Sequence, residues 1–241
     1  MFSIKTYNDS YKVDWNNFVD ISKNSTFLFK REFMDYHAEK FEDFSLLIFY
    51  NSELIALFPC NIREGEVYSH EGLSYGGIIV KGDIKFLKYL ELFTYLLKYF
   101  DEKSINKLYI KQIPSIYNSN FNGELDYLSF IIGAKIYRRD IISVIEMKNE
   151  NKISKDRIQG YKRGKKNKLE IKETDNLDEF WNSILTPTLL NRHDVNPVHS
   201  LEDIKKLKSF FNNNIKQFNV YHKGQIAVSY THLTLPTIRS V

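Results

Sequence analysis

Apolar and polar residues alternate along two stretches of the chain that a basic segment divides. The first stretch opens with a strand at Phe2–Thr6, and Asn8, Asp9 and Ser10 then offer a cap for a helix. A second helix is expected at Lys30–His37. The alternation that follows predicts four strands, at Phe44–Tyr50, Leu54–Ile62, Val67–His70 and Gly76–Val80.

A longer helix is predicted after Asp83, which caps it. Its apolar residues recur at helical spacing, at Phe86, Leu90, Phe93, Leu97 and Phe100. The remaining elements are a strand at Leu108–Lys111, a helix at Glu124–Ile132 that ends at Gly133, and two strands at Lys135–Tyr137 and Ile141–Met147. This order predicts a complete mixed α/β module over residues 1–147.

The pattern then begins again. The sequence FSIKTYN at Phe2 is matched by LEIKETD at Leu169, and FYNSELIA at Phe49 is matched by VYHKGQIA at Val220. Trp181 falls where Trp15 does in the first stretch. Three matches in the same order indicate an internal duplication, although any two α/β modules share some features at their start.

Between the two stretches lies the basic segment Asn151–Lys168, with eight lysines and arginines and a single acid, Asp156. We interpret residues 148–168 as a helical junction, in which Arg157, Tyr161 and Lys165 share one face. One reading is a solvated linker. The other is a cationic wall that holds a phosphate-bearing substrate.

The composition of the chain is typical of a globular protein whose positive charge is local. The chain has 241 residues, of which 43% are hydrophobic, and a net charge of only +4, so its positive charge is concentrated in the junction. The single cysteine, Cys60, lies in an apolar run and is expected to be a buried thiol in a reducing compartment. Met1–Ser10 is too polar for a signal peptide, and no apolar run reaches the roughly 20 residues that span a bilayer. We therefore predict a soluble cytoplasmic protein without a transmembrane segment.

The match between the two stretches stops at Ala227. The sequence VSYTHLTLPT that follows resembles the conceptual translation of a sequencing-library adapter. We therefore expect a second module at 169–227 that is truncated, and a non-native tail at 228–241 that contributes little to stability.

Several phrases resemble the acetyltransferase fold of the GNAT superfamily, and in tandem they resemble Fem-type peptidyltransferases and polysaccharide-cluster N-acetyltransferases. These phrases are SHEGLSYGGIIV at Ser69, LYIKQIP at Leu108, YRRDIISVIEM at Tyr137, KRGKKNKLEIKET at Lys162 and HDVNPVHSLEDIKKL at His193. The resemblance implies an α/β (α+β) fold, in which a GNAT-like mixed sheet is flanked by helices. It also implies transfer of an acyl group from acyl-CoA or an aminoacyl-tRNA to an amine.

The first module departs from this family at its pyrophosphate loop. The loop is expected between the fourth strand and the long helix, where the chain reads Val80-Lys81-Gly82-Asp83. Asp83 would repel a phosphate at the N-terminus of that helix. We therefore expect no tightly bound cofactor within this chain, and the equivalent loop of the second module would lie beyond Ala227.

Candidate site residues gather in two places. His70 and Tyr75 are candidates for catalysis, with paired glycines close by at Gly76 and Gly77 that permit close approach of a backbone. Equally, both could be packing residues of a strand. Candidates for binding the substrate are Glu71, Lys111, Gln112, Arg157, Tyr161 and Arg163. No metal site is expected, because His193 and His199 lack partners at ligand spacing.

Three functions follow from these patterns. The first is an acyltransferase, of the N-acetyltransferase or aminoacyltransferase type, that acts on an amine of a phosphorylated sugar or peptide precursor of the cell envelope. This truncated chain would be a poor catalyst of that reaction. The alternatives are a module that binds tRNA or another nucleic acid through the basic junction, and a non-catalytic interaction domain. Against nucleic-acid binding, the aromatic residues do not alternate with the basic ones as they would in a stacking platform.

Overall fold

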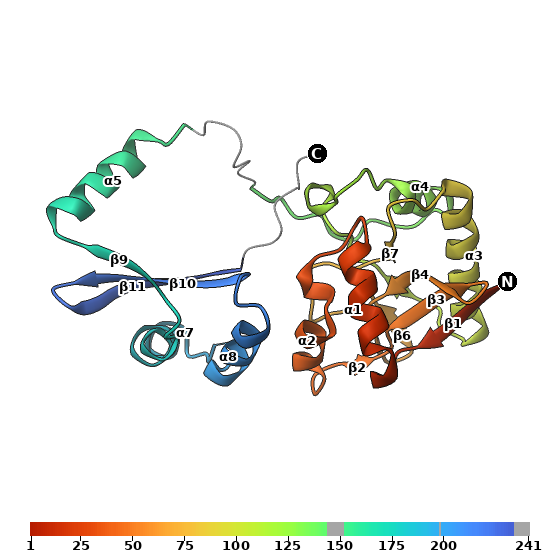
Figure 1. The fold of residues 1–241 in the computed structure, drawn as a ribbon, viewed down its shortest axis with the longest axis horizontal. Coiled ribbons are helices and arrows are strands. Elements are labelled where there is room, and N and C mark those ends of the chain that lie inside the picture. Colours follow the sequence, from red (N-terminus) through yellow and green to blue (C-terminus); the bar gives the residue numbers. More distant parts are fainter. Residues whose placement is uncertain (144–151, 198, 234–241) are drawn as a thin grey trace. The chain divides into compact units, whose positions relative to one another are not determined.

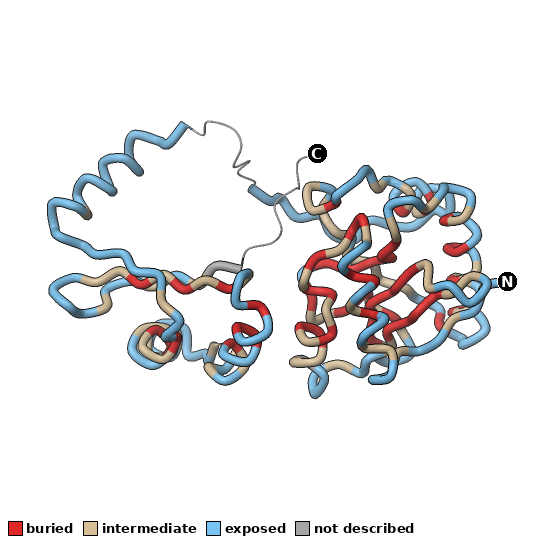
Figure 2. Tube along the Cα trace, viewed as in Figure 1, coloured by how far each residue is buried: buried red, intermediate tan, exposed pale blue. Residues whose placement is uncertain are grey.

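The computed structural model describes residues 1–143, 152–197 and 199–233. The chain forms two compact units, Met1–Ala134 and Lys135–Thr234. Figure 2 shows that buried residues concentrate on the strands of the first unit and on the helices and central strand of the second.

The first unit contains two four-stranded sheets. One has the order β1-β3-β4-β7 and is antiparallel throughout; its strands are β1 (Phe2–Thr6), β3 (Leu46–Tyr50), β4 (Glu53–Phe58) and β7 (Ile79–Val80). The other has the order β2-β5-β6-β8, with β8 parallel to β6; its strands are β2 (Glu42–Asp43), β5 (Asn61–Arg63), β6 (Glu66–Tyr68) and β8 (Leu108–Tyr109). This is the mixed α+β architecture that the sequence predicts.

Helices flank these strands. Figure 1 shows α1 (Lys12–Ile21) and α2 (Arg31–Met34) together on one side and α3 (Phe86–Glu102) on the other, with α4 (Glu124–Ile131) near α3. The core joins Leu46, Ile48 and Phe58 of the strands to α3 and α4. The buried side chains of α3 are Tyr89, Leu92, Phe93, Leu96 and Phe100.

The predicted face of α3 is therefore partly wrong. Phe93 and Phe100 are buried as expected, but Phe86 and Leu90 are 41% and 37% exposed. Tyr89 takes the inward position instead, at 1% exposure. Because Phe, Leu and Tyr occur on every side of this helix, spacing alone left its inward face ambiguous.

The strands predicted at Lys135–Tyr137 and Ile141–Met147 are not confirmed. Lys135–Tyr137 forms no strand, and neither do residues 141–143; the remaining residues, 144–147, lie outside the described part of the chain. Ile136 and Tyr137 are 73% and 65% exposed. The alternation of residue types here is correct for a strand, but within the described ranges no neighbouring strand pairs with it.

The second unit opens with α5 (Lys155–Lys166) and β9 (Glu170–Thr174). A helical stretch follows, formed by α6 (Asp178–Phe180), one wider turn (Trp181–Leu185) and α7 (Thr186–His193). Ser200 caps α8 (Leu201–Phe210) with a reciprocal hydrogen-bond pair to Asp203. A hairpin of β10 (Ile215–His222) and β11 (Gln225–Leu233) completes the unit.

The two units begin with the same order of pairing. In the first, β1 lies antiparallel to β3, and β3 forms a hairpin with β4. In the second, β9 lies antiparallel to β10, and β10 forms a hairpin with β11. Each hairpin has an irregularity in register near its turn. This is the arrangement that the repeated sequence pattern predicts for the start of both units.

The hairpin of the second unit carries polar residues on its buried face. Gln217 and Asn219 are fully buried, whereas Val228 and Tyr230 are 58% and 60% exposed. Ser229 donates a hydrogen bond of 2.5 Å to Asn219 Oδ1, and Gln217 Nε2 donates one of 2.9 Å to the same oxygen. Residues from Val228 to Leu233, which the sequence assigns to a non-native tail, thus continue β11 and pair with β10.

Candidate functional site

A loop between β6 and β7 carries three of the predicted site residues. Tyr68 pairs with Tyr109, and Gly76 forms the next contact with the same strand, opposite Gln112. The residues between Tyr68 and Gly76 therefore leave the sheet and return to it. A Cβ on Gly76 would lie 2.1 Å from the carbonyl oxygen of Ser69, so only glycine fits where the loop rejoins.

Lys111 holds this loop from the side of β8. Its backbone N–H donates to Ser69 Oγ at 2.8 Å, and its ammonium donates to the carbonyl oxygens of Leu73 and Glu71, at 2.5 and 3.3 Å. Gly76 N–H donates to the carbonyl oxygen of Lys111 at 2.5 Å. The charge of Lys111 is thus directed at the backbone of the loop.

Tyr75 and His70 both lie inside the unit, at 4% and 3% exposure. The Tyr75 hydroxyl is 2.8 Å from Thr26 Oγ1, and its ring packs edge-on against Phe29. Burial raises the pKa of Tyr75, so its hydroxyl stays protonated at neutral pH. The His70 ring packs against Phe41, with ring centroids 5.7 Å apart.

Glu71 binds across to β5. Its carboxylate accepts hydrogen bonds from Asn61 Nδ2 at 2.9 Å and from Arg63 at 2.6 Å. Gln112 is exposed where β8 ends. The structure therefore brings His70, Glu71, Tyr75, Lys111 and Gln112 together around one loop, as the sequence predicts. Their catalytic and binding roles remain predictions, because in this conformation most of their polar groups stabilise the loop.

The other predicted binding residues, Arg157, Tyr161 and Arg163, lie on α5 in the second unit. No residue of α5 is buried, and Ser154 caps the helix by accepting a hydrogen bond from the Arg157 N–H. Lys165 lies over the Tyr161 ring, 5.0 Å from its centroid. Residues 155–166 of the predicted junction thus form a helix, whereas residues 148–151 lie outside the described part of the chain.

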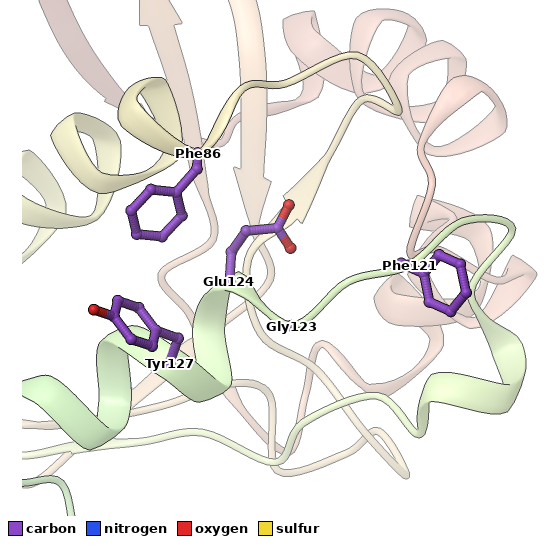
Figure 3. A pocket seen from close by; sticks show the side chains of 5 residues that line it. All are labelled: Phe86, Phe121, Gly123, Glu124 and Tyr127. Atoms are coloured by element: carbon purple, nitrogen blue, oxygen red, sulfur yellow. The ribbon is translucent and has the colours of Figure 1, made fainter.

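A hollow of about 480 Å³ lies where α3 and α4 both begin. It is lined by Phe86, Phe121, Gly123, Glu124 and Tyr127. Figure 3 shows Phe86 and Tyr127 beside each other, with Glu124 between them and the more distant Phe121. The centroids of the Phe86 and Tyr127 rings are 5.6 Å apart, at an edge-on angle.

A buried ion pair lies beside this hollow. Lys23 Nζ is 2.5 Å from Glu124 Oε1, and the two side chains are only 4% and 16% exposed. Glu124 Oε2 is buried, with no hydrogen-bond partner among the described residues. Sequence reasoning missed both residues: Lys23 and Glu124 are 101 positions apart, and neither belongs to a local motif.

The segment that carries Lys23 also occupies the edge of β7. Lys23 N–H donates to the carbonyl oxygen of Val80 at 2.9 Å, and Asn24 Nδ2 donates to the carbonyl oxygen of Ile78 at 2.7 Å. Asn24 Oδ1 accepts a hydrogen bond from the Val80 N–H at 2.9 Å. These backbone groups at the edge of β7 are therefore already satisfied by the protein itself.

The described residues offer neither a metal site nor a reactive thiol. In the described ranges, no three or more His, Cys, Asp or Glu side chains are grouped as a metal ion requires. Cys60 is fully buried and donates to the carbonyl oxygen of Phe44 at 3.0 Å. Burial raises the pKa of the Cys60 thiol, which makes it unreactive, as expected.

No helix in the described part of the chain is both long and apolar enough to cross a bilayer.

No protein-family model matches the chain, and no curated protein matches it in sequence. Among solved structures, the chain is similar to the ribosomal-protein-S18-alanine N-acetyltransferase from Escherichia coli, at 12% identity and a TM-score of 0.33. The match covers 45% of this chain and 64% of that enzyme, which is less than two thirds of its length. A likeness at this level carries no argument about activity.

Proposed function

We propose that the chain is part of a cytoplasmic acyltransferase of the tandem GNAT type. The observation that carries this proposal is the common opening of the two units, in which an edge strand, two helical segments and a hairpin follow in the same order and with the same pairing. This order is the one that the resemblance to Fem-type transferases implies. The first unit then adds a long helix, a parallel strand and a further helix, α3, β8 and α4.

The reaction would join an acyl group to an amine of a phosphorylated sugar or peptide precursor of the cell envelope. The neutral amine attacks the carbonyl carbon of the donor, a C–N bond forms and the C–S bond of a thioester or the C–O bond of an aminoacyl ester breaks. The amine proton leaves through a base, and the thiol or hydroxyl of the carrier is released. Acyl-CoA or aminoacyl-tRNA would be the donor substrate.

In this proposal the first unit binds the acceptor substrate and does not bind the acyl donor. Lys23 and Asn24 already form hydrogen bonds with the backbone groups at the edge of β7. These groups are therefore not free to bind the acyl donor. Asp83 precedes α3 and disfavours a phosphate there. The hollow at Phe86 and Tyr127 is open to a ring-bearing acceptor.

His70 and Tyr75 remain the candidates for proton transfer in this unit. Burial raises the pKa of Tyr75, so its hydroxyl stays protonated and is not a base at neutral pH. Arg157, Tyr161 and Arg163 remain candidates for holding phosphate. The guanidinium group of each arginine can bind two phosphate oxygens at once.

A second candidate function is a non-catalytic module that binds tRNA or another nucleic acid. One observation favours it: no residue of α5 is buried, and its last turn holds Arg163, Lys165 and Lys166. Such a surface attracts phosphate without regard to sequence.

Calorimetric titration of the purified chain with a nucleotide-sugar precursor, coenzyme A and a tRNA separates these functions. We expect the nucleotide sugar to bind with an affinity that falls as salt is added, and coenzyme A not to bind tightly. Micromolar binding of coenzyme A that is lost on substitutions near Lys81–Asp83 would overturn the assignment of the acceptor to the first unit. Tight binding of tRNA alone would favour the second candidate.

A further inference from the structure

We propose that α5 is a docking surface for an anionic membrane surface, which it binds through lipid phosphate headgroups. This inference does not depend on the acyltransfer reaction. It rests on the exposure, charge and composition of one helix of 12 residues, Lys155–Lys166.

The charge of α5 is concentrated and uncompensated. The helix carries six cations and one acid, Asp156, and none of the six forms an ion pair with a described residue. Elsewhere in the described chain, lysines and arginines commonly pair with acids, as Lys205 does with Asp178 at 2.5 Å. Clusters of four to eight basic residues on a helix are typical of surfaces that bind anionic lipids. The partner must therefore supply the negative charge.

Apolar side chains accompany this charge. Tyr161 and Ile158 are 60% and 41% exposed, and they are three residues apart, which places them on neighbouring positions of the helix surface. Ile153, just before the cap, is 66% exposed. All three side chains are therefore accessible at the surface. Exposed apolar groups beside lysines are stabilised where headgroups meet acyl chains, because the apolar part can enter and the ammonium groups can stay at the phosphates.

This combination distinguishes a lipid surface from a nucleic acid. A nucleic-acid surface would use the lysines and arginines, and Tyr161 could stack on a base, but Ile153 and Ile158 would gain nothing from a phosphate backbone. At a bilayer surface all three side chains lose contact with water. The helix has the basic, partly apolar character that favours membrane surfaces.

The test is co-sedimentation of the full chain with vesicles of phosphatidylcholine alone and of phosphatidylcholine with one third phosphatidylglycerol. We expect binding to the anionic vesicles only, and a loss as salt is raised. The triple variant Lys162→Gln, Lys165→Gln and Lys166→Gln should bind about a hundredfold more weakly at low salt, because each lysine near the surface raises the affinity by about fivefold. The matched control removes three exposed lysines elsewhere, by Lys98→Gln, Lys206→Gln and Lys223→Gln, and should bind nearly as the parent does.

A second variant tests the apolar contribution. Ile158→Ser with Tyr161→Ser should weaken binding to anionic vesicles and leave the slope of affinity against salt unchanged, because no charge is removed. Circular dichroism checks that the unit stays folded. Equal losses in both lysine triples, or equal binding to neutral vesicles, would overturn the proposal. So would binding to a duplex RNA probe that exceeds vesicle binding at equal phosphate concentration and is unaffected by the serine substitutions.

Discussion

Lys23 and Glu124 form an ion pair that joins the end of α1 to the first turn of α4. Their charged atoms are 2.5 Å apart, and Lys23 is almost completely buried. The pair thus connects the segment at the edge of β7 to the helix that lines the hollow. Because an ion pair that loses one partner leaves a buried charge, each residue holds the other in place.

Substituting one partner of this pair should destabilise the first unit strongly. We expect Glu124→Leu to lower the free energy of unfolding by about 3 kcal/mol, because Lys23 would be left charged and buried. The double variant Lys23→Met with Glu124→Leu should recover much of that loss. Urea unfolding of the three variants and the parent gives the coupling energy directly; additive losses would show that the two residues do not interact.

Two tyrosines with buried hydroxyl groups should respond differently to the loss of the hydroxyl. The Tyr7 hydroxyl is buried with no hydrogen-bond partner in the described chain, whereas that of Tyr75 bonds Thr26. Tyr7→Phe should therefore leave the unfolding free energy unchanged or raise it, and Tyr75→Phe should lower it by about 1 kcal/mol. Denaturation at neutral pH checks both. A large loss in Tyr7→Phe would reveal a partner for its hydroxyl.

Tyr7 should also make the protein sensitive to alkali. Burial, with Asp35, Asp9 and Asp43 nearby and opposed by Arg31, raises its pKa to about 12. The pKa of Tyr7 is therefore higher in the folded protein than in the unfolded chain, where it is near 10. The contribution of Tyr7 to stability is complete below pH 10 and is lost as the pH rises from 10 to 12. Comparing Tyr7→Phe with the parent from pH 9 to 12 isolates this contribution. The variant should lose less stability across that range, and parallel curves would contradict the assignment.

Two glycine-to-alanine substitutions should have opposite effects. Gly76→Ala places a methyl group against the Ser69 carbonyl, 2.1 Å away, and should destabilise the loop by about 3 kcal/mol. Gly160→Ala meets no atom within 4 Å inside α5 and should stabilise that helix by up to about 1 kcal/mol. Thermal unfolding followed by circular dichroism measures both. Tolerance of alanine at residue 76 would mean that the loop rejoins the strand differently.

Much of the fold could be predicted from local pattern. Strands such as Phe2–Thr6 alternate clearly, and α8 carries a capping box that marks its first residue. The inward face of α3 could not be predicted, because apolar residues surround that helix. The strand predicted at Lys135–Tyr137 is absent for another reason. A strand needs a neighbouring strand to pair with, and local sequence does not say whether one is present.

The candidate site was predicted in part. SHEGLSYGG and LYIKQIP each contain a strand end, so their residues could be expected to meet, and they do. That Lys111 would bind loop carbonyls, and so not present its charge to a ligand, depends on where Leu73 lies in space. Lys23 and Glu124 could not be paired from sequence, since only the folded sheet brings their segments together.

The hairpin of the second unit places amides inside and apolar side chains outside. Phe218 and Val220 point away from the face where Gln217 and Asn219 are buried. Sliding β10 by one residue would turn Phe218 and Val220 inward, but it would also expose Ile215, which is fully buried on the same face as the two amides. The native alignment is held by side-chain hydrogen bonds to β11, from Ser229 and Thr231. One buried isoleucine and two hydroxyl groups together therefore favour the native alignment of this hairpin.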